Sequence, residues 1–250
     1  MEDGVTGPSI EPIDDALAAV IVLAKRHGRD DLAVRLEDVG RRVARTDTIV
    51  CVVGEFKQGK SALINALLGS AVCPVDDDLA TTAVTIVRYA AQPGVTVRRR
   101  EAGEVIVEPV PSEAVADWTM ERAGPDGRRS VDPTVVELVE IGLPHPMLES
   151  GVTLVDTPGV GGLNAGHGAA TLAFLPSADA LVFVTDASAE LAATELAFLT
   201  SALRAGPPVF VAVTKIDMYP AWRRIVDLDV GHLRATGSTA TPFALSSVLE

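Results

Sequence analysis

The spacing of hydrophobic and polar positions divides the chain into two parts. Between residues 11 and 45, apolar side chains recur every three or four positions, which predicts amphipathic helix that Gly28 kinks or divides. From residue 48 onward, short continuous apolar runs alternate with helical patterns. Runs that are apolar on both faces and separated by helices are typical of a parallel sheet covered on both sides. We therefore expect an α/β fold with a mostly parallel sheet, helices on both faces and an additional N-terminal helical segment.

The same patterns place the individual elements. The predicted strands are 48–53, 82–90, 95–100, 105–110, 135–141, 152–155, 180–185, 209–213 and 243–245. The predicted helices of this second part are 61–68, 112–122, 191–203 and 222–233. We expect a disordered N-terminus over residues 1–10, a helical segment over 11–46 and one α/β domain over 47–250.

Composition and charge limit the class of protein. With 48% hydrophobic residues, the 250-residue chain can build a proper core. A formal net charge of −13 argues against nucleic acid and against broad electrostatic binding to anionic lipid. The run 98–100 consists of three arginines and is the main local exception; a solvated strand end is favoured there over a lipid or phosphate patch.

Two further absences suggest where the protein is found. No apolar stretch approaches the roughly 20 residues that a membrane-spanning helix needs, and the sequence MEDGVTGPS at the start is unlike a signal peptide. Cys51 and Cys73 lack the spacing of a metal site, so we expect buried, small hydrophobic residues. These features predict a cytoplasmic protein.

The stretch from Gly54 to Ser61 reads GEFKQGKS and satisfies the phosphate-loop pattern G-x-x-x-x-G-K-S/T between a predicted strand and a predicted helix. Backbone N–H groups of such a loop favour an anion, Lys60 would reach the β- and γ-phosphates, and the Ser61 hydroxyl would coordinate Mg²⁺. The residues expected around the phosphates are Gly54, Glu55, Phe56, Lys57, Gln58, Gly59, Lys60, Ser61 and Ala62.

A second motif, Asp156-Thr157-Pro158-Gly159, follows another apolar strand. Its aspartate would hold Mg²⁺ directly or through water, and the Gly159 N–H would meet the γ-phosphate. Thr82 is expected to bind Mg²⁺ and the γ-phosphate from a switching loop, with Thr81 as the alternative.

The choice of base is predicted from Thr214-Lys215-Ile216-Asp217, again at the end of an apolar strand. Asp217 can accept hydrogen bonds from the N1–H and 2-amino groups of guanine, which adenine lacks. The stem of Lys215 would lie along the purine, and a backbone N–H of Ser246 or Ser247 would meet the guanine O6 atom. The three motifs together predict binding and hydrolysis of Mg²⁺·GTP.

With these motifs the chain resembles the GTPase domain of the bacterial dynamin-like proteins, and is most similar to the isoniazid-inducible dynamin-like proteins of mycobacteria. The resemblance rests on GEFKQGKSALINALLG, TTAVTIVRY, LVDTPGVGGLNAGH and VTKID, and it covers about residues 48–247. The separation of 96 positions from Lys60 to Asp156 independently predicts extra elements, and hence an enlarged domain.

The resemblance implies more than the motifs do. It implies a large GTPase that lies at the inner face of the plasma membrane, associates with itself through G domains, remodels lipid and has a possible paralogous dynamin-like partner. The helical segment 11–46 would be the first neck helix, and a helical bundle with a membrane-contacting tip would belong to a longer protein.

The catalytic group itself stays open. Val160 follows Gly159, so no glutamine stands there to orient water, and Phe56-Lys57 occupies the place of a polar pair in eukaryotic dynamins. One hypothesis is that Lys57 supplies positive charge between the β- and γ-phosphates, within one chain or across a dimer. The alternative is that Lys57 is merely exposed and Phe56 packs on the loop or a partner. Two rival functions remain: a regulatory or assembly-factor GTPase, and a scaffold that binds nucleotide with little turnover.

Overall fold

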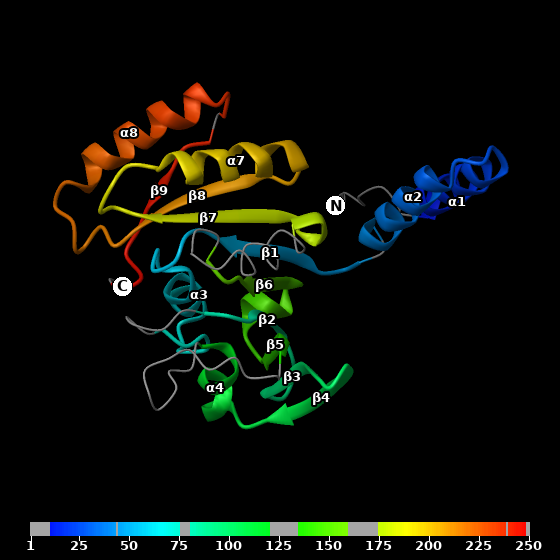
Figure 1. The fold of residues 1–250 in the computed structure, drawn as a ribbon, viewed down its shortest axis with the longest axis horizontal. Helices are drawn as coiled ribbons and strands as arrows, with labels where there is room; N and C mark the ends of the chain where they lie inside the picture. Colours follow the sequence, from blue (N-terminus) through cyan, green and yellow to red (C-terminus); the bar gives the residue numbers. More distant parts are fainter. Residues whose placement is uncertain are drawn as a thin grey trace, which may run out of the picture. The chain divides into compact units, whose positions relative to one another are not determined.

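The computed structural model describes residues 11–43, 45–75, 81–120, 135–159, 175–238 and 240–248 (Figure 1). The chain divides into two compact units, Met1–Thr46 and Asp47–Glu250.

The first unit is a pair of helices, α1 (Glu11–Arg26) and α2 (Asp30–Val43), which pack against each other. Gly28 lies in the turn between them with a φ of 67°, so this glycine divides the segment rather than kinking it. A side chain at Gly40 would come within 2.9 Å of the Leu17 side chain, so glycine allows the close approach of the two helices. An ion pair of 2.7 Å between Lys25 and Glu37 also joins them.

The described residues of the second unit form a nine-stranded sheet with the order β4-β3-β5-β2-β6-β1-β7-β8-β9. The strands are β1 (Thr48–Val53), β2 (Val84–Tyr89), β3 (Gly94–Glu101), β4 (Glu104–Val110), β5 (Val135–Leu143), β6 (Val152–Asp156), β7 (Ala180–Asp186), β8 (Val209–Thr214) and β9 (Phe243–Ala244). From β6 to β9 all neighbours are parallel, β2 and β5 are parallel to each other but run opposite to β6, and β3 and β4 add antiparallel pairs. The prediction of a mostly parallel sheet is confirmed.

Helices cover both faces of this sheet. They are α3 (Lys60–Leu68), α4 (Val115–Thr119), α5 (Pro146–Glu149), α7 (Ala193–Ala205) and α8 (Trp222–Ala235), with 3-10 turns at Ser112–Ala114 and Leu175–Ser177. Alternate residues of β1 belong to two clusters. Val52 shares one with residues of α3, α4 and α5, whereas Cys51 and Val53 share the other with residues of α7 and α8. Each fully buried aliphatic side chain contributes about 1.5–3 kcal/mol, so both faces hold the strand ends rigidly in place.

Two elements differ from the prediction. The helix expected over 112–122 is reduced to a 3-10 turn and α4, because Met120 leaves the helix to form a β-bridge with Thr81. The short helix α5 was not predicted; it begins with Pro146, whose fixed φ suits a first helical position.

The hairpin of β3 and β4 follows the predicted turn. Ala102 and Gly103 have φ angles of 51° and 90°, as a two-residue turn with two left-handed residues requires. Next to it, Arg99 and Arg100 form ion pairs with glutamates of β4 and β5. These pairs favour the interpretation of the arginine run as a solvated strand end.

Both cysteines are buried and free, as predicted. Within the described part of the chain, no helix combines the length and the apolar character of a membrane span.

Candidate nucleotide-binding site

The predicted motifs meet at one edge of the sheet, where the parallel strands β6, β1, β7 and β8 end. Asp156 closes β6 opposite Val52 of β1, and Asp186 closes β7 opposite Thr214 of β8. Ligands of open α/β sheets bind in the crevice beyond the carboxyl ends of parallel strands. A cavity of about 180 Å³ lies there, and the phosphate loop, Gly159 and Lys215 line it.

The glycines of the phosphate loop are required by close contacts. Gly54 has a φ of 152°, and a Cβ atom there would lie 2.1 Å from the carbonyl oxygen of Val184. Gly59 has a φ of 91°, and a Cβ atom would lie 3.2 Å from the Thr214 hydroxyl. The loop therefore lies directly against the ends of β7 and β8. A side chain at position 54 has no room, and one at position 59 would be crowded and strained by the positive φ.

Lys60 and Asp156, the two charged residues predicted to lie near the phosphates, are deeply buried. Lys60 is 7% exposed, and its ammonium donates a hydrogen bond of 2.7 Å to the Glu55 carbonyl oxygen. Burial lowers the pKa of Lys60 to about 8, against the opposing influence of Asp156 and Glu55. Asp156 is 1% exposed, and burial raises its pKa, although the Ser61 hydrogen bond and Lys60 act in the other direction.

Ser61 and Asp156 form a pair of oxygen ligands suited to a divalent cation. The Ser61 hydroxyl donates to Asp156 Oδ2 at 2.6 Å. The other carboxylate oxygen, Oδ1, is buried and has no hydrogen-bond partner among the described residues. Mg²⁺ prefers hard oxygen ligands and is usually held by one or two protein groups together with substrate phosphates. The donors present therefore fit Mg²⁺.

The segment after β6 packs on the phosphate loop. The Thr157 hydroxyl donates to the Val52 carbonyl oxygen at 2.8 Å, which ties this segment to β1. A Cβ atom at Gly159 would lie 2.8 Å from the Phe56 nitrogen, so only glycine fits this close to the loop. Val160, which follows, lies outside the described residues.

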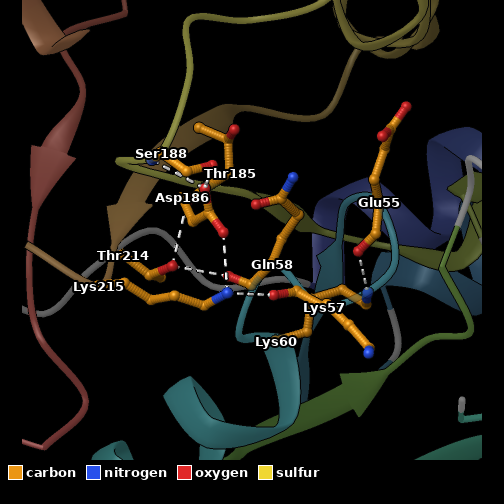
Figure 2. Close-up of polar contacts among 9 residues, drawn as sticks. All are labelled: Glu55, Lys57, Gln58, Lys60, Thr185, Asp186, Ser188, Thr214 and Lys215. Carbon is orange, nitrogen blue, oxygen red and sulfur yellow. Dashed lines mark hydrogen bonds and ion pairs between the residues drawn. The ribbon is translucent and has the colours of Figure 1, made fainter. Parts of the chain in front are cut away.

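The segment at the end of β8, residues 214–217, which is predicted to read the base, is tied to the phosphate loop by two side chains (Figure 2). The Thr214 hydroxyl donates to the Gln58 carbonyl oxygen at 2.7 Å. The Lys215 ammonium donates to the Lys57 carbonyl oxygen at 2.6 Å and to Asp186 Oδ2 at 2.8 Å. Sequence reasoning missed Asp186, although it ends an apolar strand as Asp156 does, and that position was the available signal.

The residues predicted to read the base lie at the same edge. Asp217 is exposed in the turn that follows β8. Ser246 and Ser247 follow β9, which pairs with β8, and the Ser247 hydroxyl is buried without a hydrogen-bond partner among the described residues.

The two candidate threonines lie differently. The backbone of Thr81 bridges to Met120, and Thr81 lines the cavity. The Thr82 hydroxyl donates instead to the Thr119 carbonyl oxygen at 3.3 Å, and its N–H donates to the same oxygen at 2.7 Å. This structure thus places the alternative residue, and not the preferred one, at the cavity.

The two unusual loop residues lie at the cavity as well. Lys57 has a φ of 64°, and its ammonium lies 5.3 Å from the centre of the Phe56 ring. Phe56 is 39% exposed. On the other side of the loop, the Glu55 carboxylate accepts a hydrogen bond of 3.0 Å from the Thr194 hydroxyl at the start of α7.

The comparison with known families agrees with this geometry. The model of the dynamin family matches residues 50–216, which is more than half of the chain. The chain belongs to the dynamin family. Its described domain is accordingly a dynamin-type P-loop GTPase domain.

Relatives in this family include two bacterial proteins. The isoniazid-induced protein IniA of Mycobacterium tuberculosis is 37% identical over 246 residues, which cover 98% of this chain and 37% of IniA. The bacterial dynamin-like protein of Nostoc punctiforme is 25% identical over 201 residues, which cover 75% of this chain and 27% of that protein. The chain thus spans little more than a third of the length of IniA.

Solved structures show the same fold. One describes an oligomerised bacterial dynamin pair that provides a mechanism for the long range sensing and tethering of membranes; its TM-score is 0.66 at 14% identity, covering 98% of this chain and 40% of the other. At this identity the likeness establishes the dynamin-type fold.

Proposed function

We propose that this dynamin-family domain binds Mg²⁺·GTP and hydrolyses it by in-line attack of water. One observation carries the proposal: Ser61 and Asp156 form a hydrogen-bonded pair of 2.6 Å, in which a second, buried carboxylate oxygen has no partner among the described residues. Lys60, on the same loop, carries a charge whose burial is unfavourable until an anion arrives.

Each residue has a role in this proposal. Lys60 binds the β- and γ-phosphates, and the N–H groups of the loop and of Gly159 donate to phosphate oxygens. Ser61 and Asp156 hold Mg²⁺, which when bound neutralises charge on the phosphates. Asp217 accepts from the guanine N1–H and 2-amino groups, with Lys215 along the purine. A backbone N–H in the Ser246-Ser247 segment donates to O6.

The switching threonine is proposed to be Thr81, because Thr81 lines the cavity while the Thr82 hydroxyl is directed at Thr119. We expect Thr81→Ala to slow single-turnover hydrolysis at least about tenfold, and Thr82→Ala to change it less than about twofold. The reverse result would restore Thr82 as the metal ligand.

The protein as a whole is proposed to be a membrane-remodelling GTPase that works at the inner face of the plasma membrane. Its place in the dynamin family, its similarity to IniA and its fold, which is shared with a bacterial dynamin pair, support this proposal. In this proposal the protein associates with itself through its G domains and with a paralogous dynamin-like protein. Segments outside the G domain contact lipid.

The test of nucleotide binding is a titration with labelled GTP in magnesium buffer, with ATP as competitor. Saturable binding that ATP does not displace supports the proposal, and equal competition by ATP contradicts it.

A measurement of phosphate release then distinguishes membrane remodelling from the two rival functions. Turnover per molecule that rises with protein concentration or with liposomes supports membrane remodelling, a constant rate indicates a regulatory switch, and binding without phosphate release indicates a scaffold.

A further inference from the structure

Asp186, at the end of β7, is a charged residue to which the nucleotide-binding motifs give no role. It is 7% exposed, and both of its carboxylate oxygens have partners. Oδ1 accepts hydrogen bonds from the N–H and the hydroxyl of Ser188, and Oδ2 accepts from the Lys215 ammonium at 2.8 Å (Figure 2). Burial alone would raise the pKa of Asp186, but the hydrogen bonds from Lys215 and Ser188 lower it overall, so the group is ionised at neutral pH.

The Lys215 ammonium, which is paired with Asp186, also links two loops. It donates to the Lys57 carbonyl oxygen at 2.6 Å, and thereby joins the guanine-side loop, residues 214–217, to the phosphate loop. Lys57 and Lys215 have φ angles of 64° and 56°, in the left-handed region. Such a conformation is unfavourable for a non-glycine residue, and it persists only where surrounding contacts hold it. The hydrogen bonds from the Lys215 ammonium to Lys57 and Asp186 are such contacts.

Lys215 needs a fixed counter-charge to stay in this position. Its side chain is 28% exposed, and that of Asp186 is 10% exposed. A lysine stem is flexible, and an ammonium bonded only to a carbonyl would gain hydration by turning toward solvent. A buried carboxylate that is itself held by Ser188 prevents this, because leaving it unpaired is unfavourable.

We infer that Asp186 is a positioning residue for nucleotide binding, which acts through Lys215 to hold the guanine-side loop against the phosphate loop. The inference rests on the proposed function of the same site. With both loops fixed, the base-reading carboxylate of Asp217 and the phosphate cradle keep a set separation before the nucleotide binds. Preorganisation of this kind increases affinity, because less freedom is lost on binding. It leaves the hydrolysis of nucleotide that is already bound unchanged.

Asp186→Asn is the informative variant. The amide oxygen can still accept from Ser188, so the local turn is preserved, but the charge that holds Lys215 is lost. Glu137→Gln is the matched control, because it removes a carboxylate that pairs with Arg100 in the β3–β5 region, on strands outside the cavity. We expect Asp186→Asn to raise the Kd for labelled GDP about tenfold through faster dissociation, with single-turnover hydrolysis at saturating GTP within about twofold of wild type. The control should match wild type in both measurements.

A purely structural role gives a different result. If Asp186→Asn binds GDP like wild type, or if it loses affinity only in proportion to a lower melting temperature of the nucleotide-free protein, the inference is wrong. The double variant Asp186→Asn/Lys215→Met provides the second measurement. If Asp186 acts through Lys215, the first substitution adds no further loss of affinity to the second. Additive losses would contradict that route.

Failure of the inference can be distinguished from failure of the proposed function. Hydrogen exchange of the phosphate-loop amides in the nucleotide-free protein reports the link between the loops without any ligand. Asp186→Asn should accelerate exchange at residues 55–59, and the Glu137→Gln variant should not. If the wild type bound no guanine nucleotide, the proposed function would fail, and the exchange rates would still decide whether Asp186 holds the loops together.

Discussion

The proposed nucleotide site has a phosphate side, with Lys60 and Asp156, and a guanine side, with Lys215 and Asp217. The two sides differ in how their charged groups are held. On the phosphate side, Lys60 and Asp156 are 7% and 1% exposed. Burial lowers the pKa of Lys60 and raises the pKa of Asp156, so that it favours the neutral form of both. On the guanine side, Asp217 is exposed to solvent, and the ammonium of Lys215 is already neutralised by Asp186.

The two sides should therefore contribute to nucleotide binding in different ways. Lys60 and Asp156 offset only part of the cost of burying each other's charge in the nucleotide-free protein, and under the proposed function Mg²⁺ and phosphate would relieve the rest. Under the proposed function, Asp217 stays hydrated until a guanine base covers it, and its carboxylate then needs the two donors of that base. Substitutions on the phosphate side should therefore change stability and affinity in opposite directions, whereas substitution of Asp217 should change selectivity.

The largest effect is expected from Lys60→Met. Nucleotide affinity should fall about 100-fold or more, because removing one partner of a buried charge pair costs about 2–5 kcal/mol. The melting temperature of the nucleotide-free protein should rise, by about 2–4 °C for each kcal/mol, since the buried ammonium is unfavourable there. Titration with a fluorescent nucleotide and thermal unfolding measure the two quantities.

Lys25→Met is the matched control for this prediction, because Lys25 forms an exposed ion pair in the helical pair α1 and α2. It should leave the nucleotide affinity as it is. A Lys60→Met protein that is less stable than wild type without nucleotide would show that the buried ammonium stabilises the fold, and the proposed contrast between the two sides would fail.

Asp217→Asn should exchange the preferred base. The amide can donate to the carbonyl that xanthine carries in place of the 2-amino group of guanine, and it can no longer accept from both guanine donors. We expect GTP affinity to fall about 100-fold and the xanthine nucleotide to bind better than GTP, with the melting temperature unchanged. Competition against labelled GDP measures both affinities.

The control for base exchange is Asp227→Asn, which changes an exposed carboxylate on α8. It should keep the guanine preference. If Asp217→Asn lost both nucleotides equally, the carboxylate would be supporting the loop and not reading the base.

The contrast between the two sides also shows what the sequence could predict. Lys60, Ser61 and Asp156 were predicted because each stands in a short motif next to an apolar strand, and local spacing determines where such residues point. The fold class followed from the same apolar runs, since a strand buried on both faces leaves a continuous hydrophobic pattern.

Other features depend on contacts between distant residues. The role of Asp186 depends on an ammonium 29 positions away, which a local motif does not reveal. The choice between Thr81 and Thr82 depends on the pairing of this segment with Met120 and Thr119, and two adjacent threonines at a strand start look alike in sequence. Such information exists only once the chain has folded.

Lys57 takes part in both sides of the site. Its carbonyl oxygen accepts the hydrogen bond from Lys215, and the residue also lines the cavity. We expect Lys57→Gly and Lys57→Ala to slow single-turnover hydrolysis about tenfold each, if the ammonium stabilises charge between the β- and γ-phosphates. Glycine adopts the φ of 64° without strain, so Lys57→Gly should be more stable than Lys57→Ala by about 1 kcal/mol. Rapid-quench kinetics and thermal unfolding distinguish the two effects.

Lys57→Arg retains the charge and should keep most of the activity, which makes it the control for this pair. Unchanged hydrolysis in both Lys57→Gly and Lys57→Ala would remove the catalytic hypothesis and leave Lys57 as an exposed loop residue.

The last expected effect is a dependence of affinity on pH, which is absent at neutral pH. Lys60 has a pKa of about 8 in the nucleotide-free protein, and bound phosphate raises it again, so the bound state holds more protons above that pH. Affinity for GDP should be constant below pH of about 7 and should be about tenfold weaker at pH of about 9. Burial raises the pKa of Cys51 to about 12 and that of Cys73 well above its ordinary value, so neither thiol titrates in this range.

The stability of the nucleotide-free protein should change with the opposite sign over the same range. The pKa of Lys60 is lower in the folded protein than its ordinary value of 10.5, so the unfolded chain binds more protons, and the free energy of unfolding rises with pH between these two values. Burial raises the pKa of Asp156, and protonation of this carboxylate would weaken Mg²⁺ binding. Calorimetric titration and thermal unfolding across this range should therefore give slopes of opposite sign, and parallel slopes would mean that Lys60 is not the group that titrates.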